Sequence, residues 1–440
     1  MKETRSRGPV EGAEGAEPGP AGAVVCAVEE AVRESGWCAG MLEFSGEIAA
    51  RGYLKPCEDE ALRAAQAVFL ARRAALLQVL EAMEARAGAR GGAWERERGA
   101  FVVALAAAAL LIRGMREWIE LARACRPIRK ALDQGDPVSG VPRKAFAEGY
   151  RATTRWRRRR RYEQASRHFL EHRREFDVLD GGGADWSALL EILDRELAAG
   201  PKAASLWERT CYRWFSFRRR HHSAWKSGEF GVFRWSGSLI ADLRQPGIKA
   251  SGTPKRVTTD LLQRALAAAR PGDVFITRHD DALSNLFLPG FWPHAALFAG
   301  FPEGDFLEAR KDGVKWRPAA DTLAVDAFVI LRPPLDGEGI DAALARAVKH
   351  AGKPYDFVFD FRRSDRLACT EVVYRAYQGL AGLDFALVET GGRLCLPAEE
   401  LIRQALEQGF SVVGSAGIGR GGWLSGQAAE LALHATRCGL

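Results

Sequence analysis

The chain has 440 residues, which is enough for two or three domains that each bury a hydrophobic core. It is 47% hydrophobic and 27% charged, as expected of a soluble globular protein. Its eight cysteines form no CxxC pair, which argues against a zinc knuckle or a redox motif, and the chain starts without the apolar segment of a signal peptide. We therefore expect a cytoplasmic protein with free thiols.

The first 200 residues read as a disordered tail followed by helices. Residues 1–22 are rich in Gly, Pro and Glu, which predicts disorder. Apolar residues three and four apart over 58–88, and a segment at 184–200 that follows a Gly triplet and ends on glycine, each predict a helix. The longest apolar run, 101–112, is shorter than the ~20 residues of a membrane span, so we expect a buried helix there. These segments predict an all-helical N-terminal domain over 23–235.

The net charge of +7 is concentrated towards the end of this helical domain. Residues 151–235 hold 19 Lys and Arg against 11 Asp and Glu, with arginine runs at 155–162 and 217–222 and several tryptophans nearby. Arginine attracts anionic headgroups and tryptophan favours interfaces, so an anionic membrane surface is the partner that we expect for 155–235. A five-arginine run is also typical of a solvated helix face. A nucleic acid is not expected, because no RNA- or DNA-binding motif accompanies the arginines.

After about residue 236 the pattern changes to short β-branched or aromatic runs bounded by Gly, Pro and Asp. Four of them predict strands: 272–278, 294–300, 305–310 and 326–333. Three amphipathic segments predict helices: 339–352, 365–380 and 396–409. The sequence therefore predicts an α+β domain over 236–412, with an antiparallel sheet packed by helices, behind the all-α N-terminal domain. A Gly-rich link and a short helix are predicted for 413–440.

One cysteine stands where a predicted helix begins. Cys369 lies three and four residues before Val372 and Val373, on the buried edge of that helix. The first N–H groups of a helix have no intrahelical partner and favour negative charge, so a thiol there ionises more readily than a free cysteine. The backbone N–H of Cys369 also suits one half of an oxyanion hole. A buried core cysteine fits this position equally well, so a base is needed to decide.

Two predicted strands supply candidates for that base and for a group that orients it. His294 starts one strand and Glu308 lies in the next, and a turn centred on Phe301 or on Pro302 places both on the same face of the hairpin. Their Cβ atoms are then roughly 5 to 8 Å apart, within reach of a hydrogen bond. A carboxylate there fixes the imidazole tautomer and raises its basicity, as a set of nucleophile, base and orienting group requires. His279 is the rival base, and whether it contributes stays open.

Four segments follow one another in a characteristic order: "RPGDVFITR", "HAALFAG", "FLEARKDGV" and "KPYDFVFDF...ACTEVVYRAY". This order resembles that of the YiiX/YaeF-type permuted papain-like amidases, of the NlpC-type and lecithin:retinol acyltransferase superfamily, over about residues 270–410. In that group the histidine strand precedes the cysteine helix. The resemblance implies Cys369 as the nucleophile, His294 as the base, Glu308 as the polar third member, and Tyr355 as a tyrosine that borders the site and helps to hold the oxyanion.

The same resemblance extends to residues outside the reacting set. It implies a structural role for Gly272 and Asp273, which open the first strand. It departs mildly at Thr370, since serine is common after the nucleophile in that group. It implies no cofactor and no metal, and it covers nothing before residue 270.

Three functions remain open from the sequence. The first is a papain-like thiol hydrolase, an amidase or peptidase that cleaves an amide bond of a peptide or acylated small substrate through an acyl-thioester intermediate. The second is a lipid-directed thiol acyltransferase or phospholipase, which places the protein at the periphery of a membrane. The third is a non-catalytic basic protein that binds a partner. The substrate, the choice between hydrolysis and acyl transfer, the role of the helical domain and the oligomeric state stay open.

Overall fold

The computed structural model of the chain describes residues 19–35, 37–89, 97–177, 184–198, 254–280, 290–390, 392–418 and 422–437. The chain divides into two compact units. The second unit, here called the sheet unit, comprises residues 53–60, 136–138 and 214–440. The remaining residues up to 213 form the helical unit. Of the predicted disordered tail, 1–18 lie outside the described residues, and 19–22 lie in the first helix.

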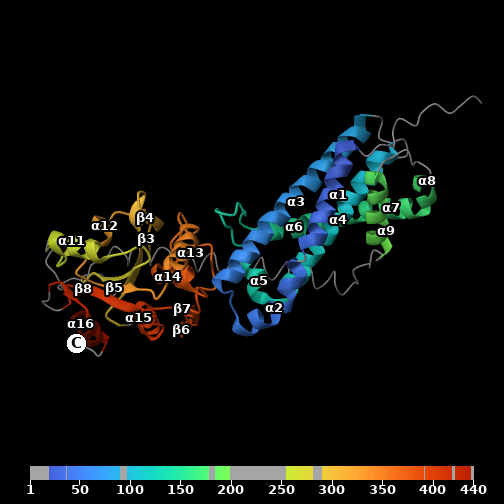
Figure 1. Cartoon of the computed structure of the whole chain (residues 1–440). Helices are drawn as coiled ribbons and strands as arrows, with labels where there is room; N and C mark the ends of the chain where they lie inside the picture. The colour runs from blue at the N-terminus through green and yellow to red at the C-terminus, as the bar shows by residue number, and fades with distance from the viewer. Residues whose placement is uncertain are drawn as a thin grey trace, which may run out of the picture. The chain divides into compact units, whose positions relative to one another are not determined.

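The helical unit is built around one long apolar helix, α4 (Figure 1). Its elements are α1 (Gly19–Ser35), α2 (Trp37–Arg51), α3 (Pro56–Ala89), α4 (Arg98–Ala124), α5 (Arg126–Ala131), α6 (Ala145–Thr154), α7 (Trp156–Glu171), α8 (Arg173–Asp177) and α9 (Ala184–Ala198). Val102 and Val103 of α4 are fully buried, and side chains of α1, α3, α7, α8 and α9 share the same core. The prediction of a buried helix at 101–112 is therefore confirmed.

Helix α4 has the length and the apolar composition of a membrane-spanning helix. The core helix of a soluble protein has the same properties, and 61% of the most apolar window of α4 is buried inside the protein. The hydrophobic surface of α4 is thus largely used by its neighbours in the helical unit.

The sheet unit contains a seven-stranded sheet with the order β4-β3-β2-β1-β5-β8-β9, in which all neighbouring strands are antiparallel. Figure 1 labels β3, β4, β5 and β8 of this sheet. Its strands are β1 (Val274–Arg278), β2 (His294–Phe301), β3 (Gly304–Arg310), β4 (Gly313–Arg317), β5 (Ala327–Arg332), β8 (Ser411–Ala416) and β9 (Leu424–Ser425), beside a small hairpin of β6 (Val388–Thr390) and β7 (Arg393–Cys395). Its helices are α11 (Thr259–Ala268), α12 (Ala319–Thr322), α13 (Gly337–Val348), α14 (Cys369–Tyr377), α15 (Ala398–Glu407) and α16 (Gln427–Arg437). The predicted α+β class is confirmed.

Alternation along the strands gives the large sheet two buried faces. One face, with Ile276 and Leu297, packs in the same hydrophobic core as α13, α14, α15 and α16. The other face, with Phe275, Phe298 and Phe306, packs with α11 and α12. Because side chains two residues apart share a face, the even-numbered residues of β2 and β3 point towards the α12 side.

The start of β1 shows why glycine and aspartate stand there. Gly272 has a φ of +90°, and a Cβ on it would lie 2.6 Å from the Ile340 side chain. Only glycine fits this conformation and this space without strain. Its carbonyl accepts a hydrogen bond from the Tyr377 hydroxyl, while Asp273 pairs with Arg332 at 2.7 Å. Both residues thus tie the first strand to neighbouring elements, in agreement with the expected structural role.

Of the two elements predicted for 413–440, the terminal helix is found as α16, whereas the start of the Gly-rich link differs from the structure. Residues 411–416 form β8, which pairs with β5 inside the sheet. The small residues there permit close packing, since a Cβ on Gly414 would lie 2.6 Å from the ring of Trp423. Helix α16 adds Ala429 and Leu433 to the main core. The segment is therefore part of the sheet unit. Its glycines are typical of a linker, but Gly414 serves close packing.

Candidate active site

Cys369 is the first residue of α14, as predicted. Only 2% of its surface is exposed. The preceding residue, Ala368, donates its backbone N–H to the Glu371 carboxylate at 3.3 Å, which fixes the start of the helix. The sulfur lies 3.9 Å from the carbonyl oxygen of Pro293, the residue directly before β2. The helix start therefore meets the beginning of the histidine strand.

His294 is the first residue of β2, and Glu308 lies in β3. Leu297 faces Leu307 in the register of these strands, which makes Glu308 a diagonal neighbour of His294, as a turn centred on Pro302 requires. The Nε2 atom of His294 lies 2.7 Å from Oε2 of Glu308. The imidazole also lies close enough to the Cys369 thiol for the two groups to shift each other's pKa. The structure thus brings Cys369, His294 and Glu308 together at one place.

The other oxygen of Glu308 has three further partners that the sequence analysis did not identify. The Thr322 hydroxyl donates to Oε1 at 3.0 Å. The guanidinium groups of Arg310 and Arg317 lie 2.9 and 3.2 Å from the same oxygen. Arg310 could have been found from its spacing of two residues along the strand, which puts it on the same face as Glu308. No sequence signal points to Arg317 or Thr322, since they come from β4 and α12. Both oxygens of the Glu308 carboxylate thus have partners: Oε2 contacts His294, and Oε1 contacts the hydroxyl and the two guanidinium groups.

The pKa shifts of the central pair favour its charged form. Burial opposes the charge on the imidazole, but the charge of Cys369, its hydrogen bond and Glu308 raise the pKa of His294 to about 9. Burial likewise opposes the thiolate, but His294 and the backbone N–H groups of Ala295 and Thr370 lower the pKa of Cys369 below that of an ordinary thiol. Burial also opposes ionisation of Glu308, but the hydrogen bond and charge of His294, the charge of Arg310 and the Thr322 hydroxyl together lower the pKa of the carboxyl. The shifts of His294 and Cys369 both favour a thiolate beside an imidazolium over the uncharged pair.

Tyr355 reaches the site through a short parallel bridge. The chain at Tyr355 pairs with Leu367, two residues before Cys369. The N–H of Asp356 donates to the Leu367 carbonyl, and the N–H of Leu367 donates to the Pro354 carbonyl, both at 3.0 Å. Burial first, and then the charges of Cys369 and Asp356, raise the pKa of Tyr355 well above its usual value. The half-buried phenol therefore stays protonated and can donate a hydrogen bond.

The residues just before His294 are fixed by the C-terminal helices of the sheet unit. The Glu399 carboxylate, on α15, accepts the backbone N–H groups of Phe291 and Trp292 at 2.6 and 2.9 Å. The fully buried Trp292 ring donates its indole N–H to the Thr436 hydroxyl of α16 at 3.0 Å. These bonds set the path of the chain into β2. Trp292 is thus an anchor of this turn.

His279, the rival base, lies at the end of β1 and close enough to His294 for their charges to interact. Burial, and then the positive charges of Lys255, His294 and Arg310, lower the pKa of His279 to about 4. The Glu308 carboxylate pairs with His294 and not with His279, so the orienting group belongs to His294. Residues 281–289 lie outside the described residues. Within the part of the chain that the structure describes, no group of three or more His, Cys, Asp or Glu side chains is placed to hold a metal ion.

Comparison with known protein families gives a match for the sheet unit. Residues 268–416, roughly a third of the chain, match the model of the permuted papain-like amidase family, YaeF/YiiX, C92. This match confirms the resemblance found in the sequence and supports a papain-like amidase or peptidase, and thus a hydrolase. No curated protein and no solved structure matches the chain.

Proposed function

We propose that the sheet unit is a cysteine amidase that cleaves an amide bond through an acyl-thioester on Cys369. The observation that carries this proposal is the meeting of three groups: the Cys369 sulfur lies 3.9 Å from the carbonyl oxygen of Pro293, next to His294, and the His294 ring lies 2.7 Å from Glu308. Such a set holds a nucleophile and a proton donor for the leaving amine side by side. The family match to residues 268–416 supports the same class of chemistry.

The reaction follows from the protonation states of this pair. The Cys369 thiolate attacks the amide carbonyl, and a C–S bond forms. The His294 imidazolium gives its proton to the leaving nitrogen as the C–N bond breaks, which leaves an acyl-thioester and a neutral imidazole. His294 then takes a proton from water, the hydroxide attacks the thioester, and the C–S bond breaks. The thiolate and the imidazolium are restored, and Glu308 holds the ring in place in both steps.

We assign two donors to the oxyanion that forms during each attack. The backbone N–H of Cys369 lies in the first turn of α14, where N–H groups have no intrahelical partner. We assign the second donor to the Tyr355 hydroxyl, because its raised pKa keeps the proton in place beside the thiolate. Donors held in a buried site of this kind stabilise developing charge strongly.

A trapping experiment tests the proposal. The full chain is incubated with fluorogenic acyl amides and, in parallel, with phospholipid esters, and is quenched in acid before mass analysis. We expect amide hydrolysis and a mass increment of one acyl group on the peptide that contains Cys369. The Cys369→Ser variant is expected to lose both, whereas Cys395→Ser keeps them, since burial raises the pKa of the Cys395 thiol and makes it a poor nucleophile.

Two outcomes of the trapping experiment contradict an amidase. Acylation of Cys369 by phospholipid esters alone identifies the lipid-directed thiol enzyme instead. The absence of acylation by either substrate class leaves the non-catalytic binding protein as the remaining function.

The raised pKa of His294 predicts the pH dependence of the reaction. The rate kcat/KM should rise as the Cys369 thiol loses its proton below the usual thiol pKa, and should fall as His294 loses its proton near pH 9. Protonated His294 also stabilises the fold fully below about pH 6.5, and this contribution is lost as the pH rises through about 9, so unfolding is monitored in parallel. A rate that instead rises with a single midpoint near 6.5 and stays flat to pH 10 shows that neutral His294 acts as the base, and contradicts the ion pair.

A further inference from the structure

The first two turns of α7 form an arginine surface. Arg155, at the N-cap of the helix, and four exposed arginines within it have no acidic partner among the residues that the structure describes: Arg157, Arg158, Arg160 and Arg161. Arg159 differs, because it is half-buried and pairs with Glu163 at 2.8 Å. The name "arginine surface" is used below for Arg155, Arg157, Arg158, Arg160 and Arg161.

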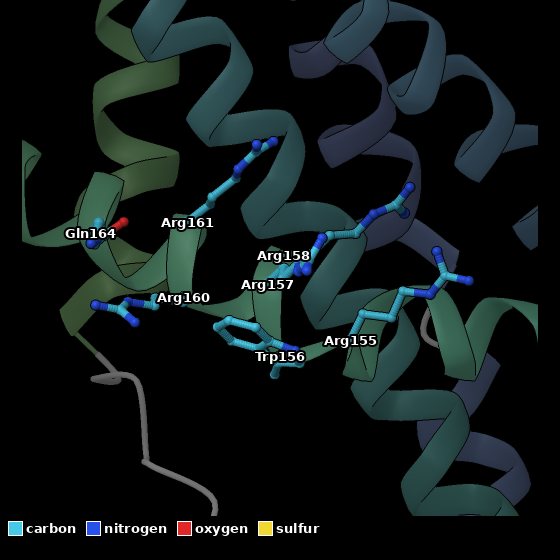
Figure 2. A pocket seen from close by; sticks show the side chains of 7 residues that line it. All are labelled: Arg155, Trp156, Arg157, Arg158, Arg160, Arg161 and Gln164. Carbon is cyan, nitrogen blue, oxygen red and sulfur yellow. The ribbon is translucent and has the colours of Figure 1, made fainter.

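The arginine surface surrounds a shallow hollow of about 420 Å³, which Trp156 and Gln164 also line (Figure 2). Figure 2 shows the side chains fanning out from the start of the helix, with Arg160 and Arg161 on one side of Trp156 and Arg155 and Arg158 on the other. The guanidinium groups do not converge on one point. This arrangement fits a partner that offers several anionic groups spread over a surface better than it fits one small anion.

These charges stand where a helix is least suited to hold them. The N-terminus of a helix is its positive end, and the first turn of α7 contains no acidic residue. Burial lowers the pKa of Arg73 on α3, and the charge of Arg158 lowers it further. The positive field of the arginines therefore reaches a neighbouring helix. A segment that keeps unpaired cations at this end of a helix is typical of a functional site, because an anionic partner removes the repulsion.

Two exposed apolar side chains share the outward face of the helix with the arginines. Trp156 is 65% exposed, and Arg157 lies over its ring at 5.7 Å from the centroid. Leu170 is 49% exposed and, fourteen residues further along, falls within about 40° of Trp156 around the helix axis. A helix that combines exposed arginines with an exposed tryptophan and leucine fits the boundary between lipid headgroups and acyl chains.

We propose that α7 binds the surface of an anionic lipid bilayer, with the arginine surface on the lipid phosphates and Trp156 at the headgroup boundary. A nucleic acid offers similar phosphates, but it gives no partner to Leu170. Each arginine near an anionic bilayer contributes about 1 kcal/mol, so several together give a stable but salt-sensitive attachment. This binding is independent of the chemistry proposed for Cys369, because all of its residues belong to the helical unit.

Sedimentation with vesicles tests this proposal on the full chain. Vesicles contain phosphatidylcholine alone or phosphatidylcholine with phosphatidylserine, and bound protein is measured at several salt concentrations. We expect binding only to the anionic vesicles and weaker binding as salt rises. The double variant Arg160→Gln/Arg161→Gln should bind about 30-fold more weakly, since two charges are removed. Trp156→Ala should weaken binding at all salt concentrations by a similar factor, because its contribution is not electrostatic.

The chain offers a matched control for the loss of charge. Arg33 on α1 and Arg126 on α5 are exposed arginines of the same unit that do not line the hollow. The variant Arg33→Gln/Arg126→Gln has the same net charge as the double variant of α7 and should bind like the wild type. Equal losses in both double variants, or no binding to anionic vesicles at low salt, overturn the proposal. Binding to single-stranded RNA that depends on Arg160 and Arg161, without vesicle binding, makes a nucleic acid the partner and also overturns it.

Discussion

Replacement of His294 by alanine is expected to lower kcat/KM for amide hydrolysis by about 10⁶-fold, the size of the loss when the base of a catalytic triad is removed. The buried Cys369 thiol then loses the positive charge that lowers its pKa, while burial continues to oppose the thiolate. The leaving amine also loses its proton donor. Both the nucleophile and the acid are therefore lost in one substitution.

The loss of the thiolate can be measured without a substrate. The rate of alkylation by iodoacetamide is followed for the peptide that contains Cys369, so that the other cysteines do not contribute. We expect His294→Ala to move the midpoint of this rate to higher pH and to lower it at pH 7. His279→Ala is the matched control, since His279 lies nearby without a bond to Glu308, and it should leave rate and midpoint near those of the wild type. The opposite pattern in the two variants identifies His279 as the base.

Replacement of Glu308 by glutamine is expected to lower kcat/KM by about 10²- to 10⁴-fold and to destabilise the fold. Glutamine keeps the size of the side chain but removes the charge that helps to raise the pKa of His294. It also leaves Arg310 and Arg317 beside a neutral group. We expect a loss of up to about 3 kcal/mol in the free energy of unfolding, the low end for a broken buried pair, because both guanidinium groups keep part of their surface exposed.

Denaturant unfolding, kinetics and NMR titration of His294 separate the parts of this effect. The pKa of His294 should fall in Glu308→Gln, which moves the alkaline limit of activity to lower pH. Asp312→Asn is a matched control, because Asp312 also pairs with Arg317, at 2.5 Å, and keeps 42% of its side chain exposed. It should change both stability and activity little. If the two variants behave alike, the carboxylate of Glu308 has no special role in orienting the base.

The central residues of the site could be predicted because each depends on local sequence rules. The helix start at Cys369 follows from the apolar spacing behind it, and the shared face of His294 and Glu308 follows from strand alternation and a short turn. In both cases a local pattern fixes the direction of a side chain. The antiparallel pairing of β2 and β3 then brings His294 and Glu308 close together. The fold class and the main helices of the sheet unit were predictable for the same reason.

The supporting contacts of the site could not be predicted, because they depend on tertiary packing. Arg317 comes from β4, a strand of five residues with two basic side chains that gives no clear alternation. Thr322 comes from a single turn of helix, and Glu399 reaches the turn before β2 across more than a hundred residues. Strand β8 was not predicted because its small residues are typical of a linker. Their role becomes clear only from the packing of Trp423 against Gly414.

The turn that leads into β2 has a consequence for when the protein can act. Its backbone is fixed by Glu399, and the ring of Trp292 by Thr436, so the turn before His294 lacks these supports until both residues have been made. A nascent chain on the ribosome already contains the sulfur at residue 369 but lacks these supports. We therefore expect the turn before His294 to take its final path only after translation has passed α16.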